Sequence, residues 1–266
     1  MRPITILTDS AVQFTHPTFP GFDLVNIIPL FPVEKENQES FRLSASSDQD
    51  IQIILKEASQ NSGHVFAILS SGYLSALPNQ ILRLLRVSSA APHIIIIDSQ
   101  TIGIGTGYLV EKAAALAASG ESSVEIETTI REACGTLYTT VIMPDIRPLV
   151  PIGLVDAAQA NAVSILSIQS IFSLEEGLPT PLVKVRNRKA AYEYLVEFID
   201  EFEKLHLIAG IQEALTDEAD FQIITDHLNE FYPDNEWLTY PPNAAWKTIF
   251  GKNSYGLVIV SNEESR

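Results

Sequence analysis

The chain has 266 residues, enough for one large domain or two of ordinary size. Its formal net charge of −16 excludes nucleic acid and anionic membranes as partners, because both select a basic surface. The single cysteine, Cys134, excludes an internal disulfide and a metal site built from several cysteines. We find neither a signal peptide nor an apolar run of membrane-spanning length, so we expect a soluble cytoplasmic protein.

The first half of the chain alternates apolar runs with amphipathic stretches. This alternation predicts a parallel sheet with helices on both faces, a three-layer α/β domain over residues 1–148. Ser47 is a predicted helix cap, and Gly63 is the predicted end of that helix. The other predicted elements are strands at residues 3–8, 24–31, 64–69 and 93–97 and helices at residues 75–87, 108–118 and 123–136.

A glycine-rich turn, Gly103-Ile104-Gly105-Thr106-Gly107, follows the fourth predicted strand. It resembles a dinucleotide-binding fingerprint, but the final spacing differs and the glycines begin five residues after the strand. We therefore assign the glycines to close helix–sheet packing and expect no cofactor. No cluster of acidic residues or histidines has the spacing of metal ligands, so we expect no metal site.

Beyond residue 149 the predicted strands follow one another directly. This order indicates hairpins and a second, α+β domain over residues 149–266 with a largely antiparallel sheet. We expect strands at residues 163–173, 182–186, 205–211 and 255–260 and helices at residues 189–204 and 217–231.

The segment after the third predicted strand is the first candidate for a binding site. Residues 64–69 lack polar alternation, which predicts a strand buried on both faces. Ser70, Ser71 and Gly72 follow, and a helix resumes near Leu74. Such a connection leaves backbone N–H groups free at the positive end of the helix dipole, where a polar or anionic head group is stabilised. Alternatively, the two serines only cap the helix.

Four sequence elements together resemble the DegV family. They are Ile-Leu-Thr-Asp-Ser at the start, Ser-Ser-Gly-Tyr-Leu-Ser at residues 70–75, Ile-Asp-Ser with the glycine-rich turn, and Val-Lys-Val-Arg-Asn-Arg-Lys-Ala at residues 183–190. Their order covers nearly the whole chain. The resemblance implies two α/β domains that bind a fatty acid in a crevice between them. It also implies a carrier role without catalysis, with a separate fatty acid kinase as partner.

The resemblance also assigns head-group residues in the first half. Ser75 matches the serine that holds the carboxylate, although Ala76 replaces the glycine that follows and the loop is one residue longer. The register set by Ser47 leaves Leu43 where the family has a threonine, with Ser44 as the only nearby hydroxyl.

Two further family ligands are replaced in the second half. Leu154 stands where the family's Gly-Gly-Arg-Ile element has its arginine. The family's His-Thr-Gly-Pro-Gly element reads Ile-Phe-Gly-Lys-Asn here, so Ile249 and Phe250 replace its histidine and threonine. We expect His64 and His93, which open strands, to be structural or solvent-facing and not catalytic.

These replacements affect the binding free energy of the carboxylate of a fatty acid more than that of its acyl chain. An acyl chain gains roughly 0.8 kcal/mol per buried methylene, on the order of 10 kcal/mol in total, from an apolar tunnel alone. An unpartnered carboxylate costs several kcal/mol or takes up a proton. We therefore expect either a neutral or differently shaped apolar ligand, or a closed site. The alternatives are a ligand-free interaction scaffold and a hydrolase that uses Asp9 or Ser75.

Overall fold

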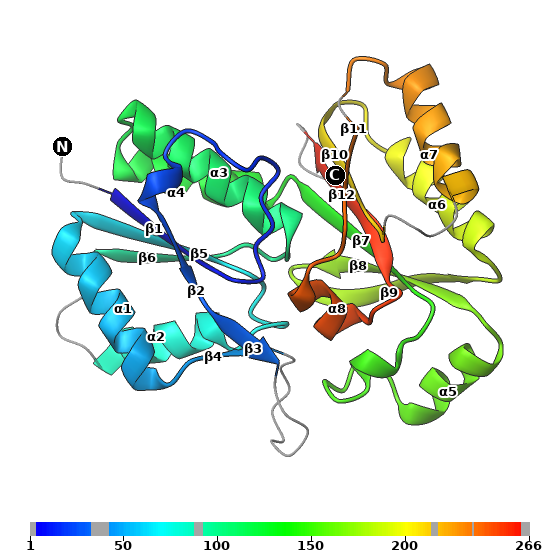
Figure 1. Cartoon of the computed structure of the whole chain (residues 1–266), viewed down its shortest axis with the longest axis horizontal. Helices are drawn as coiled ribbons and strands as arrows, with labels where there is room; N and C mark the ends of the chain where they lie inside the picture. Colours follow the sequence, from blue (N-terminus) through cyan, green and yellow to red (C-terminus); the bar gives the residue numbers. More distant parts are fainter. Residues whose placement is uncertain (1–3, 33–42, 88–92, 214–217, 236, 262–266) are drawn as a thin grey trace. The chain divides into compact units, whose positions relative to one another are not determined.

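The computed structural model describes residues 4–32, 43–87, 93–213, 218–235 and 237–261. Residues 3 and 217, the predicted first residues of a strand and a helix, lie outside these ranges. The chain forms two compact units, Met1–Gly135 and Thr136–Arg266 (Figure 1).

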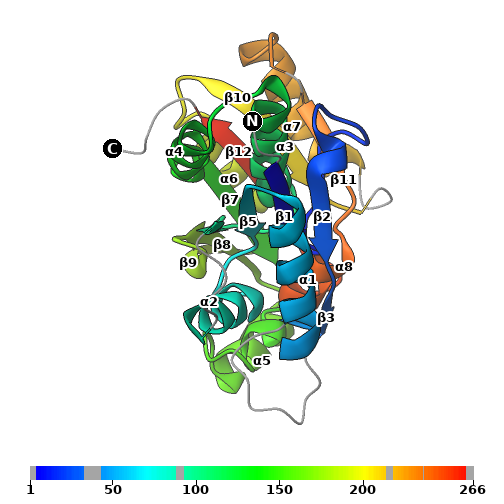
Figure 2. The same ribbon diagram turned by 90° about the vertical axis from the view of Figure 1, so that its left-hand side faces the viewer.

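The first unit is a three-layer α/β structure, as the sequence predicts. Its main sheet has the order β2-β1-β5-β6, with all neighbouring strands parallel. Helices α1 and α2 share an apolar cluster on one face of this sheet, and α3 lies against β1 and β5 beside α4 on the other (Figure 2). The elements are β1 (Ile4–Asp9), η1 (Phe22–Leu24), β2 (Val25–Ile28), β3 (Leu30–Pro32), β4 (Leu43–Ala45), α1 (Asp48–Asn61), β5 (His64–Leu69), α2 (Leu77–Val87), β6 (Ile94–Asp98), α3 (Ile104–Ser119) and α4 (Ser123–Cys134).

Local sequence signals explain several of these elements. Ser47 caps α1, because its side chain accepts a hydrogen bond from the backbone N–H of Asp50. The strand β5 is buried at five of its six positions, as expected for the interior of a parallel sheet. The predicted second strand over residues 24–31 is broken between β2 and β3, and β3 leaves the main sheet to pair with β4.

The glycine-rich turn forms the beginning of α3, which starts four residues earlier than predicted. A Cβ atom at Gly107 would lie 2.1 Å from the backbone oxygen of Gln13. Glycine at this position therefore lets α3 approach the segment after β1 closely, so the close contact is with this segment and not with the sheet as predicted.

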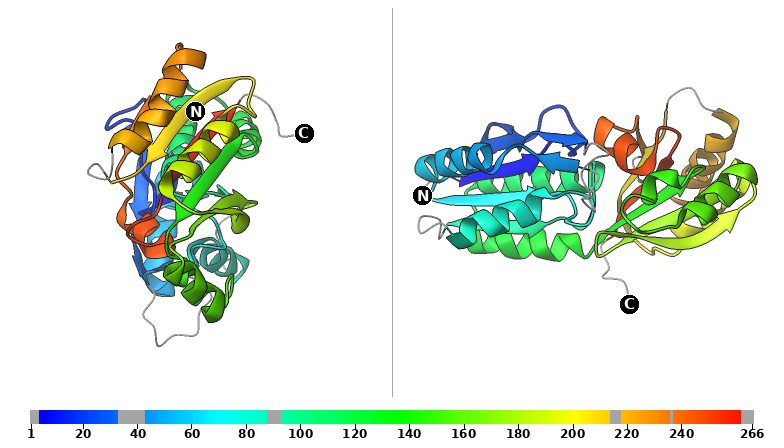
Figure 3. Two further views of the ribbon diagram at one scale, coloured as in Figure 1. Left: turned by 90° about the vertical axis from the view of Figure 1, so that its right-hand side faces the viewer. Right: turned by 90° about the horizontal axis from the view of Figure 1, so that it is seen from below.

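The second unit is built on a six-stranded mixed sheet of order β11-β10-β12-β7-β8-β9. Only β10 and β11 are parallel among its paired strands, so the sheet is largely antiparallel, as predicted. Helices α6 and α7 pack side by side over one face (Figure 3). The elements are β7 (Leu137–Met143), η2 (Arg147–Leu149), α5 (Ala157–Ile165), β8 (Gln169–Glu175), β9 (Leu178–Val185), α6 (Arg188–Ile199), β10 (Leu205–Ile211), α7 (Glu218–Phe231), β11 (Trp237–Tyr240), α8 (Ala244–Phe250) and β12 (Tyr255–Ser261).

The sequence interpretation differs from the second unit in several places. The first residues of the predicted strand over residues 163–173 belong instead to the end of α5. This helix is capped at its start by Asp156, whose side chain accepts a hydrogen bond from the backbone N–H of Gln159. The division after Gly135 also precedes the predicted boundary at residue 148, because β7 pairs with β12 and β8 and so belongs to the second sheet. Neither α8 nor β11 was foreseen.

Candidate functional site

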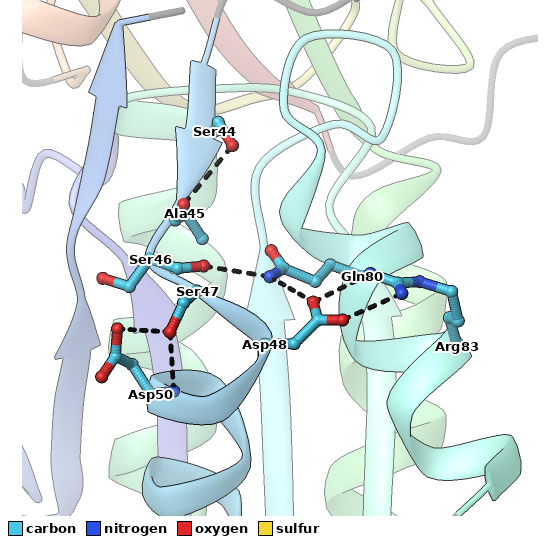
Figure 4. Close-up of polar contacts among 8 residues, drawn as sticks. All are labelled: Ser44, Ala45, Ser46, Ser47, Asp48, Asp50, Gln80 and Arg83. Carbon is cyan, nitrogen blue, oxygen red and sulfur yellow. Dashed lines mark hydrogen bonds and ion pairs between the residues drawn. The ribbon is translucent and has the colours of Figure 1, made fainter.

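The structure brings together the four predicted site residues of the first unit. Leu43 forms a parallel bridge with Ser75, and the backbone N–H of Ala76 donates to the backbone oxygen of Leu43 over 3.1 Å. Leu43 and Ser75 are buried, whereas Ser44 and Ala76 are half-buried. The hydroxyl of Ser44 donates to the backbone oxygen of Ala45 (Figure 4). These residues form one continuous patch where β4 meets the segment before α2.

Polar contacts hold β4 in this position (Figure 4). The amide of Gln80 on α2 donates to the backbone oxygen of Ser46 and to the carboxylate of Asp48, each over 3.0 Å. Arg83 pairs with the same carboxylate through two hydrogen bonds. The hydrogen bond from Gln80, together with Arg83, lowers the pKa of Asp48. The end of β4 is thereby fixed to α2, next to Ser75.

The segment from the end of β5 to the first residue of α2, which we call the serine loop (residues 70–77), is anchored at its start by Asp9. The Asp9 carboxylate accepts hydrogen bonds from the backbone N–H of Ser70 (2.7 Å), the hydroxyl of Ser70 (2.9 Å) and the backbone N–H of Ala11 (3.0 Å). Burial raises the pKa of Asp9, an effect opposed by these hydrogen bonds and reinforced by Asp98. Asp9 is fully buried and engaged by donors, so it fits a structural role and not that of a hydrolase nucleophile.

A second carboxylate anchors the middle of the serine loop. Asp98, at the end of β6, accepts hydrogen bonds from the backbone N–H groups of Gly72 (3.0 Å) and Gln100 (2.8 Å). Partial desolvation raises the pKa of Asp98, and the two hydrogen bonds oppose that rise. Between the two carboxylates, the backbone N–H of Ser71 donates to the backbone oxygen of Thr101 over 2.8 Å.

Every backbone N–H of the serine loop has an acceptor inside the first unit. Ser71 accepts from the next residues: its hydroxyl from Tyr73, and its backbone oxygen from Leu74 and Ser75. The N–H of Ala76 binds Leu43, and that of Leu77 donates to the Ser75 hydroxyl over 3.3 Å. The expected free N–H groups are therefore absent from residues 70–77, and that prediction is wrong.

The alternative that Ser70 and Ser71 cap the helix is also wrong, because α2 begins only at Leu77. The hydroxyl that accepts the backbone N–H of Leu77 is that of Ser75. The Ser75 oxygen accepts that bond, which leaves its O–H hydrogen available as a donor. At the contact between the serine loop and Leu43, the polar group that can face a ligand is thus the neutral hydroxyl of Ser75.

The other three predicted site residues belong to the second unit. Leu154 is half-buried in the turn after η2, and Ile249 and Phe250 are buried at the end of α8. Phe250 packs edge-on against Trp246, with ring centroids 4.8 Å apart. These side chains are apolar, so none of them replaces the charged or polar group that the family pattern has at its position.

A pocket of ≈ 250 Å³ lies beside Phe250 and was not predicted. It is lined by Pro144, Asp145 and residues 250–254. These residues connect β7 to η2 and α8 to β12. The sequence signal that could have indicated it is the run Gly-Lys-Asn-Ser directly before the last strand, because such residues are typical of turns.

Other reactive residues fit structural roles. Burial, with a smaller contribution from Asp98, raises the pKa of Cys134 to about 11, so its thiol stays protonated and unreactive. His64 and His93 lie edge-to-face, with ring centroids 6.2 Å apart. In the described parts of the chain, no group of three or more His, Cys, Asp or Glu side chains could hold a metal. No described helix is long and apolar enough to cross a bilayer.

The fold defines a protein with a parallel α/β unit and a second unit around a largely antiparallel sheet, and comparison with known proteins identifies its family. The family model described as "Uncharacterised protein, DegV family" matches residues 25–262. The chain belongs to the DegV family, which confirms the resemblance seen in the sequence.

Relatives include a DegV domain-containing protein of Staphylococcus aureus (strain COL), which is 21% identical over 226 residues, 85% of this chain and 80% of the relative. Among solved structures, a DegV family protein from Thermus thermophilus, described as binding fatty acid, has a TM-score of 0.78 at 21% identity and covers 98% of this chain and 100% of its own. The Streptococcus pneumoniae Fatty Acid Kinase (Fak) B3 protein, loaded with linoleic acid, has a TM-score of 0.77 at 18% identity with the same coverages. These likenesses confirm the fold.

Proposed function

We propose that this protein binds a fatty acid or a related long apolar ligand and has no chemistry of its own. Family membership supports this proposal, as do solved structures of the same fold that are described with fatty acids. The observation that carries it is the patch of Leu43, Ser44, Ser75 and Ala76, in which the buried Ser75 hydroxyl keeps one hydrogen to donate. The tunnel between the two domains stays a prediction.

The head group favoured by this patch is neutral. A hydroxyl next to the leucine side chain of Leu43 can hydrogen-bond an alcohol, an amide or a protonated acid. An ionised carboxylate would face one neutral donor, and the serine loop has no N–H to add. Desolvating that carboxylate costs several kcal/mol, which is a large fraction of the roughly 10 kcal/mol available from an acyl chain. We therefore propose that a bound fatty acid is held in its protonated form.

The direct test is to remove bound lipid from the protein and titrate it with a fatty acid and a fatty alcohol of equal chain length. Affinity for the acid should fall as the pH rises, whereas affinity for the alcohol should stay constant. Ser75→Ala should weaken alcohol binding about fivefold, since a neutral hydrogen bond contributes about 1 kcal/mol. Ser119→Ala, which removes an exposed hydroxyl on α3, is the matched control.

Two outcomes would contradict this proposal. If neither ligand binds and native mass spectrometry finds no lipid in the freshly purified protein, a ligand-free scaffold is favoured. If the acid binds more tightly than the alcohol at every pH, the head group is ionised and other partners hold it.

We also propose that the protein is a carrier for the lipid that it binds. One relative of the same fold is described as a component of a fatty acid kinase, which supports delivery of the bound lipid to a separate kinase. Phosphorylation of the loaded protein's lipid by such a kinase, and its loss in Ser75→Ala, would support this role.

A further inference from the structure

The strand β2 forms an open edge of the main sheet in the first unit. Among the described strands, β1 is its one neighbour (Figure 2). The backbone N–H of Ser10 donates to the backbone oxygen of Ile28 over 2.9 Å, so Ile28 directs its backbone groups towards β1. Backbone groups alternate in direction along a strand, so Ile27 directs its N–H and its oxygen away from the sheet. Neither group has a hydrogen-bond partner in the part of the chain that the structure describes.

The opposite edge of the same sheet, β6, is closed by side chains. The guanidinium of Arg131 donates to the backbone oxygen of Ile96 over 3.3 Å, and the thiol of Cys134 donates to that of Asp98 over 3.8 Å. Both donors belong to α4, which thereby shields β6 from a further strand. The edge at β2 lacks such donors among the described side chains, so it can accept another strand.

Three apolar side chains are exposed along β2 and at its two ends. Phe22 lies just before the strand, Ile27 within it and Phe31 after it, and they are 46%, 51% and 52% exposed. The intervening Ile28 and Leu30 pack into the apolar cluster beneath α1 and α2, so Ile27 and Phe31 point away from that cluster. We call these three side chains, with the outward backbone groups of Ile27, the β2 edge.

The charge of the chain indicates which partner suits the β2 edge. Residues 24–32 contain no charged side chain, in a chain whose formal net charge is −16. Edge strands that avoid association generally carry lysine or other charges, and this one does not. Two copies of the chain repel each other as wholes, so an uncharged surface is where they approach with the least repulsion. A basic partner would gain nothing from this surface.

The β2 edge is also complementary to itself. If a two-fold axis passes beside Ile27, the two strands run antiparallel, and Ile27 donates to and accepts from Ile27 of the second copy. The end of β2 next to Phe22 then meets the end next to Phe31 in the second copy. The outward backbone groups and the exposed apolar side chains of each copy are thus matched by those of the other.

The area of this contact predicts its strength. Each of the three side chains is about half exposed and contributes roughly 100 Å² of apolar surface, or about 600 Å² for the two copies. Stable interfaces bury about 1,200 Å² or more. The contact is therefore sufficient for a weak, reversible association.

We propose that the protein forms a weak dimer by antiparallel pairing of β2 with β2 of a second copy, which joins the two main sheets into one. The β2 edge includes none of Leu43, Ser44, Ser75 and Ala76, so this proposal goes beyond the proposed lipid function and does not require it.

The first experiment is analytical ultracentrifugation of the full-length protein over a concentration series that reaches the millimolar range. We expect the average mass to rise from that of a monomer towards that of a dimer. The association should become several-fold tighter at high salt, because salt screens the repulsion between molecules of charge −16. An association through charged surfaces would respond in the opposite direction.

Two substitutions at the centre of the contact separate its side-chain and backbone parts. Ile27→Lys should abolish the dimer, because it places like charges opposite each other. Ile27→Pro keeps an apolar side chain and removes the central N–H, so it should weaken the dimer at least about tenfold. Ile53→Lys changes an isoleucine on α1 that is 48% exposed, and as the matched control it should dimerise like the unaltered protein. Circular dichroism checks that each variant is folded.

A cross-linking experiment tests the antiparallel register. The Cα atoms of a hydrogen-bonded antiparallel pair are about 5.5 Å apart, a distance that a disulfide can span. Mild oxidation should therefore convert Ile27→Cys into a covalent dimer, whereas Ile53→Cys should remain monomeric. Cys134 is present in both variants, and its protonated thiol should not react in either.

The proposal is overturned if the unaltered protein stays monomeric at millimolar concentration, or if the dimer weakens as salt is added. Equal dimerisation of Ile27→Lys and Ile53→Lys, or equal cross-linking of the two cysteine variants, would also overturn it. These measurements need no lipid, so a failure to bind fatty acids or fatty alcohols leaves them unaffected.

Discussion

The serine loop and the turn at residues 251–254, which we call the lysine turn, are both short polar connections at the ends of interior strands, yet their hydrogen bonds are opposite in kind. Each N–H of the serine loop has a partner within the first unit. At the centre of the lysine turn, two consecutive described residues have N–H groups without acceptors. The number of donors that a polar connection can offer a ligand thus depends on how many of them its own fold already engages.

This difference in hydrogen bonding depends on what the carboxylates near each segment bind. Asp9 and Asp98 accept N–H groups of the serine loop, so these side chains take the place that a ligand anion would occupy. In the second unit, the comparable carboxylate, Asp145, is paired with Arg147. The serine loop is consequently held in place by internal hydrogen bonds around the Ser75 hydroxyl. In the lysine turn, the positive charge of Lys252 is not offset by Asp145, because Asp145 is paired with Arg147.

The largest effect should follow from Asp9→Ala. This change leaves two N–H groups and the Ser70 hydroxyl without an acceptor in a fully buried position, at a cost of about 3 kcal/mol in the free energy of unfolding. Urea denaturation followed by circular dichroism measures it. Asp98→Ala is the control, and it should cost about 1 kcal/mol, because water can reach the exposed groups that it leaves. Equal costs for the two changes would contradict the structural role of Asp9.

A smaller, pH-dependent effect is expected for Asp9→Asn. Burial raises the pKa of Asp9 above 3.8, so above that value the folded state keeps a proton that the unfolded state has released. The stability contributed by Asp9 is therefore fully present below 3.8 and falls as the pH rises through the raised pKa. The difference in unfolding free energy between the unaltered protein and Asp9→Asn should shrink over this window. A difference that grows with pH would show that the pKa is lowered.

The smallest effect should follow from Lys252→Pro. The N–H that proline removes has no acceptor among the described residues, and the φ of Lys252 is not positive, so the ring can be accommodated at the second position of the turn. We expect a change within about 0.5 kcal/mol in the free energy of unfolding, measured by the same denaturation. A loss as large as that of Asp98→Ala would mean that this N–H has a structural partner after all.

Much of the fold could be predicted from the sequence because its signals are local. The buried run of β5, the Ser47 cap and the alternation of strands and helices define the first unit from neighbouring residues. The start of β8 is predicted too early because the end of α5, Val163 to Ile165, alternates apolar and polar residues as a strand does, and no glycine or proline separates it from β8. Seven-residue α8 was missed because it has little periodicity to detect.

The candidate site was harder to predict, because it depends on contacts between distant residues. The sequence could place Leu43 near Ser75 through the family pattern, and the structure has them paired. It could not indicate that Asp9, 61 positions before Ser70, would occupy the donors of the serine loop. The pocket was missed for the same reason, because Pro144 and Asp145 approach residues 250–254 only when β7 and β12 pair.

The edge strand β9 has a consequence for behaviour at high concentration. Pro179 and Pro181 lie in this strand, which has β8 as its one neighbour among the strands that the structure describes. Proline has no N–H to donate, so an extended chain arriving at this edge would find its ladder interrupted at alternate positions. Assembly into fibrils through β9 is thereby disfavoured, and the repulsion between molecules of charge −16 adds to this protection.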